Sequence, residues 1–160
     1  MFNLSKFKAL FRPDSLPPYE RAIVALEGGA YDDALARFDA ILAGPALPPA
    51  ERAKVHNKRG IALVNLRRRD DALAAFQAAL DLQPRYAPAL VNVGNLCLED
   101  GDLDDAVSHY QSAILADEQY PVAHLNLGIA FKRLGRTSES VRELKLASRL
   151  EGRVFPRRSK

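Results

Sequence analysis

The chain has 160 residues, of which 48% are hydrophobic and 27% charged, a composition typical of one soluble domain. No stretch approaches the roughly 18 apolar residues of a membrane-spanning helix. The single cysteine, Cys97, excludes an intramolecular disulfide and favours a reducing compartment such as the cytoplasm. Residues 1–12 and residues 151–160 each carry a charge of +3, so residues 13–150 carry −3 within the total of +3. This acidic body argues against a nucleic-acid-binding domain.

The N-terminal segment, residues 1–16, is basic and amphipathic. Its apolar side chains recur at helical spacing, and its lysines lie off that face. Three interpretations remain open: a cap over the first folded unit, an anchor at a membrane surface, and a segment that docks on a partner or on a second copy. The residues that would make these contacts are Phe2, Leu4, Lys6, Phe7, Lys8, Leu10 and Phe11.

From residue 18 onward, apolar residues recur at helical spacing and are interrupted by turns that contain glycine or proline. Gly101 is expected to end one helix in the left-handed conformation, and Asp102 to cap the next one. The expected helices are 18–27, 31–43, 50–66, 70–82, 86–99, 103–116, 120–134 and 137–150.

A 34-residue repeat organises these helices. Gly60, Gly94 and Gly128 are related by this period, and each is followed by a small residue twelve positions on. A large apolar residue comes four positions later: Phe76, Tyr110 or Leu144. A fourth unit precedes them and fits the pattern less well. The interval from its Ala34 to the equivalent Ala72 exceeds the period by four positions. We place the four extra residues in the loop 44–49. A 34-residue period is typical of stacked supersecondary units.

These residues resemble the tetratricopeptide repeat family, whose units are 34-residue helix–turn–helix pairs. The resemblance implies an all-α, right-handed superhelix, or α-solenoid, of about four helix pairs. It also implies a concave face formed by the first helix of each pair, recognition of peptides or short helices, and no catalysis. The repeat domain covers residues 17–151, with a basic tail at 152–160, and its units are about 17–48, 53–86, 87–120 and 121–151. His56 and His124 stand where the family commonly has a large aromatic residue.

By this resemblance, one side of each first helix faces a peptide-binding groove. The groove residues are Lys54, Asn57, Ile61, Val91, Asn95, Leu98, Leu125, Ile129 and Lys132. Asparagine suits this position because its amide both donates and accepts hydrogen bonds with a peptide backbone. The alternative is that the asparagines bond only to neighbouring helices.

Other candidate sites have ordinary structural explanations. The acidic stretch 99–105 lacks the calcium-loop pattern, and the histidines have no metal-ligand spacing with Cys97. No nucleophile comes with a plausible base, and no phosphate-binding loop is present, so we expect no catalytic residues, no metal and no cofactor. Arg67, Arg68 and Arg69 occupy a helix–turn–helix corner, where they form either a solvated turn or a docking patch for an acidic partner.

We therefore expect a non-catalytic adaptor or scaffold whose groove holds a segment of another protein. The alternative is a structural protein that assembles with itself or lies on a membrane surface. The last helix pair motivates this second hypothesis, because Leu146 lies away from the inward apolar stripe of its helix.

Overall fold

The computed structural model describes the backbone of residues 16–154 and the side chains of residues 16–152. This part of the chain is entirely helical. Its helices are α2 (Pro18–Glu27), α3 (Tyr31–Ala43), α4 (Pro49–Asn65), α5 (Arg69–Leu82), α6 (Ala87–Asp100), α7 (Leu103–Ala116), α8 (Pro121–Arg133) and α9 (Thr137–Val154). The prediction of an all-α fold is confirmed, with α9 extending four residues beyond its expected end. The seven contact residues predicted in the N-terminal segment lie outside the described residues.

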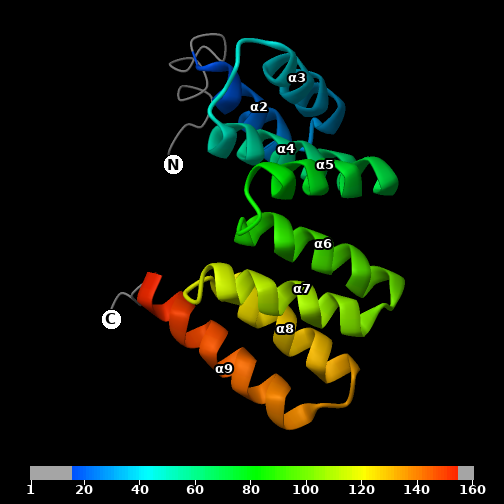
Figure 1. The fold of residues 1–160 in the computed structure, drawn as a ribbon, viewed down its shortest axis with the longest axis vertical. Coiled ribbons are helices and arrows are strands. Elements are labelled where there is room, and N and C mark those ends of the chain that lie inside the picture. Colours follow the sequence, from blue (N-terminus) through cyan, green and yellow to red (C-terminus); the bar gives the residue numbers. More distant parts are fainter. Residues whose placement is uncertain (1–15, 155–160) are drawn as a thin grey trace, which may run out of the picture.

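The helices form four antiparallel pairs stacked along the long axis of the molecule, from α2–α3 at one end to α8–α9 at the other (Figure 1). The first helices also contact one another along the stack, α2 with α4, α4 with α6 and α6 with α8. No comparable contact joins successive second helices in the described part of the chain. The first helices therefore form the inner side of the stack, as expected of an α-solenoid.

The repeated glycines mark the points where the two helices of a pair cross. A Cβ atom added at Gly60 would lie 2.6 Å from Cδ1 of Phe76, closer than side-chain carbons pack. At Gly94 the Cβ would lie 2.7 Å from Cε1 of Tyr110, and at Gly128 it would lie 2.8 Å from Cγ of Leu144. The large residue of the second helix thus fills the space that the glycine leaves, which explains why the two positions recur together.

The four extra residues of the first unit lengthen α4, which differs from our expectation of a longer loop. Pro49, the first residue of α4, stands one helical turn further from Gly60 than Ala87 and Pro121 stand from the equivalent glycines of their own helices. The addition is therefore one turn at the start of α4. Proline is favoured in the first turn of a helix, because its fixed φ suits that position. Its lack of an N–H costs nothing there, since N–H groups of the first turn have no acceptor within the helix.

Three turns between paired helices contain glycine in the left-handed conformation, with φ of 78° at Gly29, 89° at Gly101 and 75° at Gly135. The fourth turn has Arg67 at the same position with φ of 61°. Gly101 thus ends α6 as expected. Asp102, however, makes no side-chain capping hydrogen bond to α7. Its ψ of 70° departs from the extended conformation in which a capping carboxylate reaches the next amides.

Replacing Arg67 by glycine is expected to stabilise the protein by about 0.5–1 kcal/mol. The left-handed conformation is unfavourable for a residue with a Cβ, and glycine removes this cost from the folded state. Glycine also raises the conformational entropy of the unfolded chain, but this destabilising effect is the smaller of the two. Arg67 is also exposed, so little packing is lost. Denaturant unfolding monitored by circular dichroism would measure the change. Arg68→Gly, one residue on and at φ of −94°, is the matched control and should destabilise; equal stabilisation by both would contradict the explanation.

Candidate peptide-binding groove

The predicted groove residues belong to α4, α6 and α8, the first helices of three pairs, and their exposure differs. Lys54, Leu125, Ile129 and Lys132 are exposed; Ile61, Asn95 and Leu98 are half-buried; Asn57 and Val91 are buried. We call these nine residues the inner-face band. The two buried members are covered by neighbouring helices, so they are excluded from direct contact with a ligand in this conformation.

The exposed apolar side chains of the band are concentrated on α8. Leu125 and Ile129 are 37% and 36% exposed, and Val122 on the same helix is 39% exposed. These residues follow the i, i+3, i+7 spacing of a single helix face. Sequence reasoning missed Val122, although this spacing from Leu125 and Ile129 was visible in the sequence. Together they form an apolar stripe in contact with water, which we call the α8 stripe.

Asparagine side chains connect the successive first helices. The Asn92 amide donates to Oδ1 of Asn57 at 2.8 Å, and the Asn126 amide donates to Oδ1 of Asn95 at the same distance. The Tyr110 hydroxyl also donates to Oδ1 of Asn95, at 2.8 Å. These bonds run from side chain to side chain, so the asparagines hold α4, α6 and α8 in register. Burial raises the pKa of the Tyr110 hydroxyl, which therefore stays protonated and able to donate.

Asn95 keeps unused hydrogen-bonding capacity on its amide nitrogen. Its Oδ1 already accepts two hydrogen bonds, but its Nδ2 donates none within residues 16–152. The side chain is half-buried and lies on the same helix face as Leu98. Its amide can therefore donate to a carbonyl of a bound peptide while its oxygen stays committed to the protein.

Lysines stand at the two ends of the band. Lys54 on α4 pairs with Glu51 at 2.9 Å, and this hydrogen bond raises the pKa of Lys54. Lys132 on α8 is exposed and makes no ion pair with any described residue. The accessible surface thus runs from a cation through half-buried apolar side chains to the α8 stripe and a second cation.

Two residues of the arginine corner bind within the protein. Arg68 pairs with Asp71 at 2.8 Å. Arg69 donates to the Leu96 carbonyl at 2.5 Å and also contacts the carboxylates of Glu99 and Asp100. The guanidinium thereby satisfies the C-terminal end of α6 in the next unit, where the helix dipole favours a cation. The corner is thus partly an inter-unit contact, in addition to being a solvated turn.

His56 and His124 occupy equivalent repeat positions but differ in environment. His124 is buried; its Nδ1 lies 2.7 Å from Oε2 of Glu143, and its Nε2 lies 3.1 Å from the Glu118 carbonyl. His56 is half-buried, and its pKa is lowered by burial and by the charges of Arg52 and Arg59. Among the described side chains, no group of three His, Cys, Asp or Glu residues is placed to hold a metal ion.

Cys97 is half-buried where two clusters of buried side chains meet. Burial raises the pKa of its thiol, and the carboxylates of Asp105, Asp102 and Asp100 act in the same direction. The thiol is therefore protonated near neutral pH, which makes it a weak nucleophile.

A model of the tetratricopeptide repeat family matches residues 57–123, the segment that contains the Asn57–Asn92 hydrogen bond and five of the nine residues of the inner-face band. The crystal structure of MamA shares the architecture, with a TM-score of 0.70 and 22% identity over 87% of this chain and 79% of that one. Residues 57–123 therefore contain tetratricopeptide repeats, and the described helices have the fold of such repeats. No described helix of this tetratricopeptide repeat protein is long and apolar enough to cross a membrane.

Other tetratricopeptide repeat structures share the fold. YrrB, described as having an unusual peptide-binding site, aligns with a TM-score of 0.64 and 22% identity over 88% of this chain and 69% of its own. The second repeat domain of Spaghetti (RPAP3), bound to an HSP90 peptide, aligns with a TM-score of 0.58 and 20% identity over 61% of this chain and 91% of its own. A curated relative, the probable UDP-N-acetylglucosamine–peptide N-acetylglucosaminyltransferase SPINDLY of Arabidopsis thaliana, is 35% identical over 81 residues. That match spans 51% of this chain and 9% of SPINDLY.

Proposed function

We propose that this tetratricopeptide repeat protein is a non-catalytic adaptor that holds a segment of another protein against the inner faces of α4, α6 and α8. The observation that carries the proposal is the α8 stripe, three apolar side chains left in contact with water. Apolar surface of this kind gains free energy when a partner covers it. The peptide-binding site of YrrB and the peptide bound to the Spaghetti domain support peptide recognition by this fold.

The chemistry of the accessible band defines the ligand. Apolar side chains of the ligand would pack on Leu125 and Ile129, and its backbone would accept a hydrogen bond from the free Asn95 amide. Lys132 at one end favours a carboxylate on the ligand. The expected ligand is thus an extended or helical peptide with two or more aliphatic or aromatic anchors and an acidic residue beside them.

The test uses peptides selected on the purified protein from a displayed random library, followed by titration of one selected peptide with the wild type and with variants. Leu125→Asp should weaken binding about 10- to 100-fold, because burial of a leucine side chain is worth about 1.5–3 kcal/mol. Leu115→Asp is the matched control. Leu115 is 71% exposed on α7, a second helix, so its variant should bind like the wild type.

Two results would contradict the proposal that this face binds the peptide. One is an equal loss of affinity in both variants, since this would indicate a nonspecific apolar contact. The other is unchanged binding of the selected peptide by Leu125→Asp. Far-UV circular dichroism of each variant would verify that the helices remain formed.

Self-association is a second candidate, and the position of the α8 stripe favours it. The stripe lies on the helix pair at one end of the described stack, and Val141 on α9 is also 44% exposed there. Sedimentation velocity over a range of concentrations distinguishes the two functions. Assembly would be favoured over the adaptor if the protein associates with itself, if Leu125→Asp abolishes this association, and if no selected peptide competes with it.

A further inference from the structure

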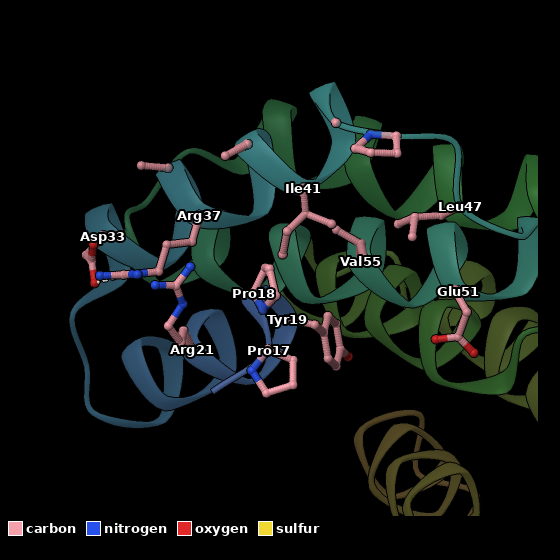
Figure 2. Close-up of a pocket in the computed structure, with 14 residues that line it drawn as sticks. Pro17, Pro18, Tyr19, Arg21, Asp33, Arg37, Ile41, Leu47, Glu51 and Val55 are labelled. Atoms are coloured by element: carbon pink, nitrogen blue, oxygen red, sulfur yellow. Dashed lines mark hydrogen bonds and ion pairs between the residues drawn. The ribbon is translucent and has the colours of Figure 1, made fainter. Parts of the chain in front are cut away.

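A cavity of about 800 Å³ opens between α2, α3 and the start of α4 (Figure 2). No residue of the inner-face band lines it. Its volume lies within the range of pockets that enclose a ligand. The apolar side chains of its wall come from three elements and the loop between α3 and α4: Pro17, Pro18, Tyr19, Ile41, Leu47 and Val55. The cavity is therefore a second surface suited to an apolar occupant.

This cavity belongs to the part of the first unit that departs from the 34-residue period. The loop residues Gly44, Pro45 and Leu47 line one side, and Glu51 lines it from the added turn of α4. A second pocket, between the next two units, is smaller, at about 240 Å³. The insertion thus coincides with the larger hollow, and the wall of that hollow is mainly apolar.

Among the described charged groups around the cavity, one buried N–H donor lacks an acceptor. Arg37 pairs with Asp33 at 2.8 Å, and Glu51 pairs with Lys54 at 2.9 Å. The Nε of Arg21, by contrast, is buried and makes no hydrogen bond with any described residue. An unpaired buried donor is unfavourable by about 1–3 kcal/mol, so an occupant that brings an oxygen acceptor to this point gains from that contact as well as from apolar burial.

The chain's own N-terminal segment meets these requirements. The described chain begins beside the cavity, because Pro17 and Pro18 form part of the wall (Figure 2). The N-terminal segment carries Leu4, Phe7, Leu10 and Phe11 on one helical face, and its backbone carbonyls or the Asp14 carboxylate supply acceptors for Arg21. The charge of +3 on residues 1–12 complements the −3 of residues 13–150. A tethered segment also has an effective concentration of order millimolar, which favours it over a free ligand.

We infer that the cavity between α2, α3 and α4 is the docking site of residues 1–12, which pack their apolar helical face into it and cap the first repeat. A helix of 12 residues is about 18 Å long, and residues 13–17 separate residue 12 from α2. In the docked state, the phenylalanines of the segment are withheld from membranes and from other proteins. This inference does not depend on the inner-face band, so it can fail or succeed separately from the proposed adaptor function.

The test is paramagnetic broadening in the full-length chain. A spin label is attached at Ala9→Cys, off the apolar face, in a Cys97→Ala background, and the methyl groups of Ile, Leu and Val are isotope-labelled. The methyl signals of Ile41, Leu47 and Val55 should be lost and should return when the label is reduced. Signals of Leu125 and Ile129, at the other end of the stack, should be retained.

Two variants and one mixed sample make the result specific. Leu47→Asp places a carboxylate in the cavity wall and should restore the signals of Ile41 and Val55, whereas Leu115→Asp on α7 should leave them broadened. In a mixture of spin-labelled chains with isotope-labelled chains that lack the label, no signal should be lost. Loss in the mixture would overturn the inference in favour of a second copy. Loss at Leu125 and Ile129 instead, or no selective loss at all, would overturn it as well.

Discussion

Replacing Gly60 by alanine should lower the free energy of unfolding by about 1–3 kcal/mol, the usual effect of overpacking a filled core. The new Cβ would lie 2.6 Å from Cδ1 of Phe76, whose side chain is fully buried and therefore has no free space into which to move. Helix propensity alone predicts the opposite sign, because alanine is favoured over glycine in a helix by about 1 kcal/mol. Denaturant unfolding of the two proteins would measure the difference.

Gly152→Ala provides the matched control, since it makes the same chemical change in α9, where the added Cβ meets no described atom within 4 Å apart from its chain neighbours and the backbone of its own helix. This variant should be neutral or stabilised by up to about 1 kcal/mol. A second control is the Phe76→Ala background, in which Gly60→Ala should no longer destabilise because the ring is gone. Equal effects of Gly60→Ala and Gly152→Ala would show that the close helix crossing is not the reason for the repeated glycine.

His124→Phe should also destabilise the protein, by about 1–3 kcal/mol, although phenylalanine is the kind of residue that the family commonly has there. The substitution removes the partner of Glu143, which lies 2.7 Å from the imidazole and has a side chain only 17% exposed. The Glu118 carbonyl loses a contact too. The cost comes from leaving a largely buried carboxylate without a hydrogen bond, and thermal or denaturant unfolding would detect it.

The equivalent residue in another unit supplies the comparison. His56 is half-buried, makes no ring hydrogen bond with any described residue, and has a pKa lowered by burial, so His56→Phe should be neutral or stabilising. Adding Glu143→Leu to His124→Phe should recover stability, because both members of the polar pair are then replaced. A destabilisation of His56→Phe as large as that of His124→Phe, or no recovery in the double variant, would exclude the Glu143 contact as the cause.

The periodic features were predictable because they depend on local spacing. A 34-residue interval that relates Gly60, Gly94 and Gly128 specifies helix pairs of equal length, and the helix bounds followed to within a few residues. The left-handed turn was predicted at Gly101, and the structure shows the same conformation at Gly29 and Gly135 and at Arg67 in the fourth turn. Each of these features follows from the backbone preferences of a few adjacent residues.

The candidate binding residues were predictable only as repeat positions on one face of each first helix. Helical spacing assigned Asn57 on α4 and Val91 on α6 to the same kind of position as Leu125 and Ile129 on α8. Spacing within one helix carries no information on which of its residues the next helix covers. Asn92 reaches Asn57 from the following unit, and this contact accounts for part of the burial. The exposure of a repeat position therefore depends on its neighbours in the stack.

Residue order was enough to specify a stack of helix pairs, the approximate helix ends, and the small residues that allow the helices to cross. Those properties arise from spacing and conformational preference within about one repeat. The folded arrangement was needed to show that one of two equivalent histidines has a carboxylate partner, that the inserted residues extend α4, and that an apolar cavity lies beside the extra turn. These outcomes depend on packing between residues distant in the sequence, which a local pattern does not encode.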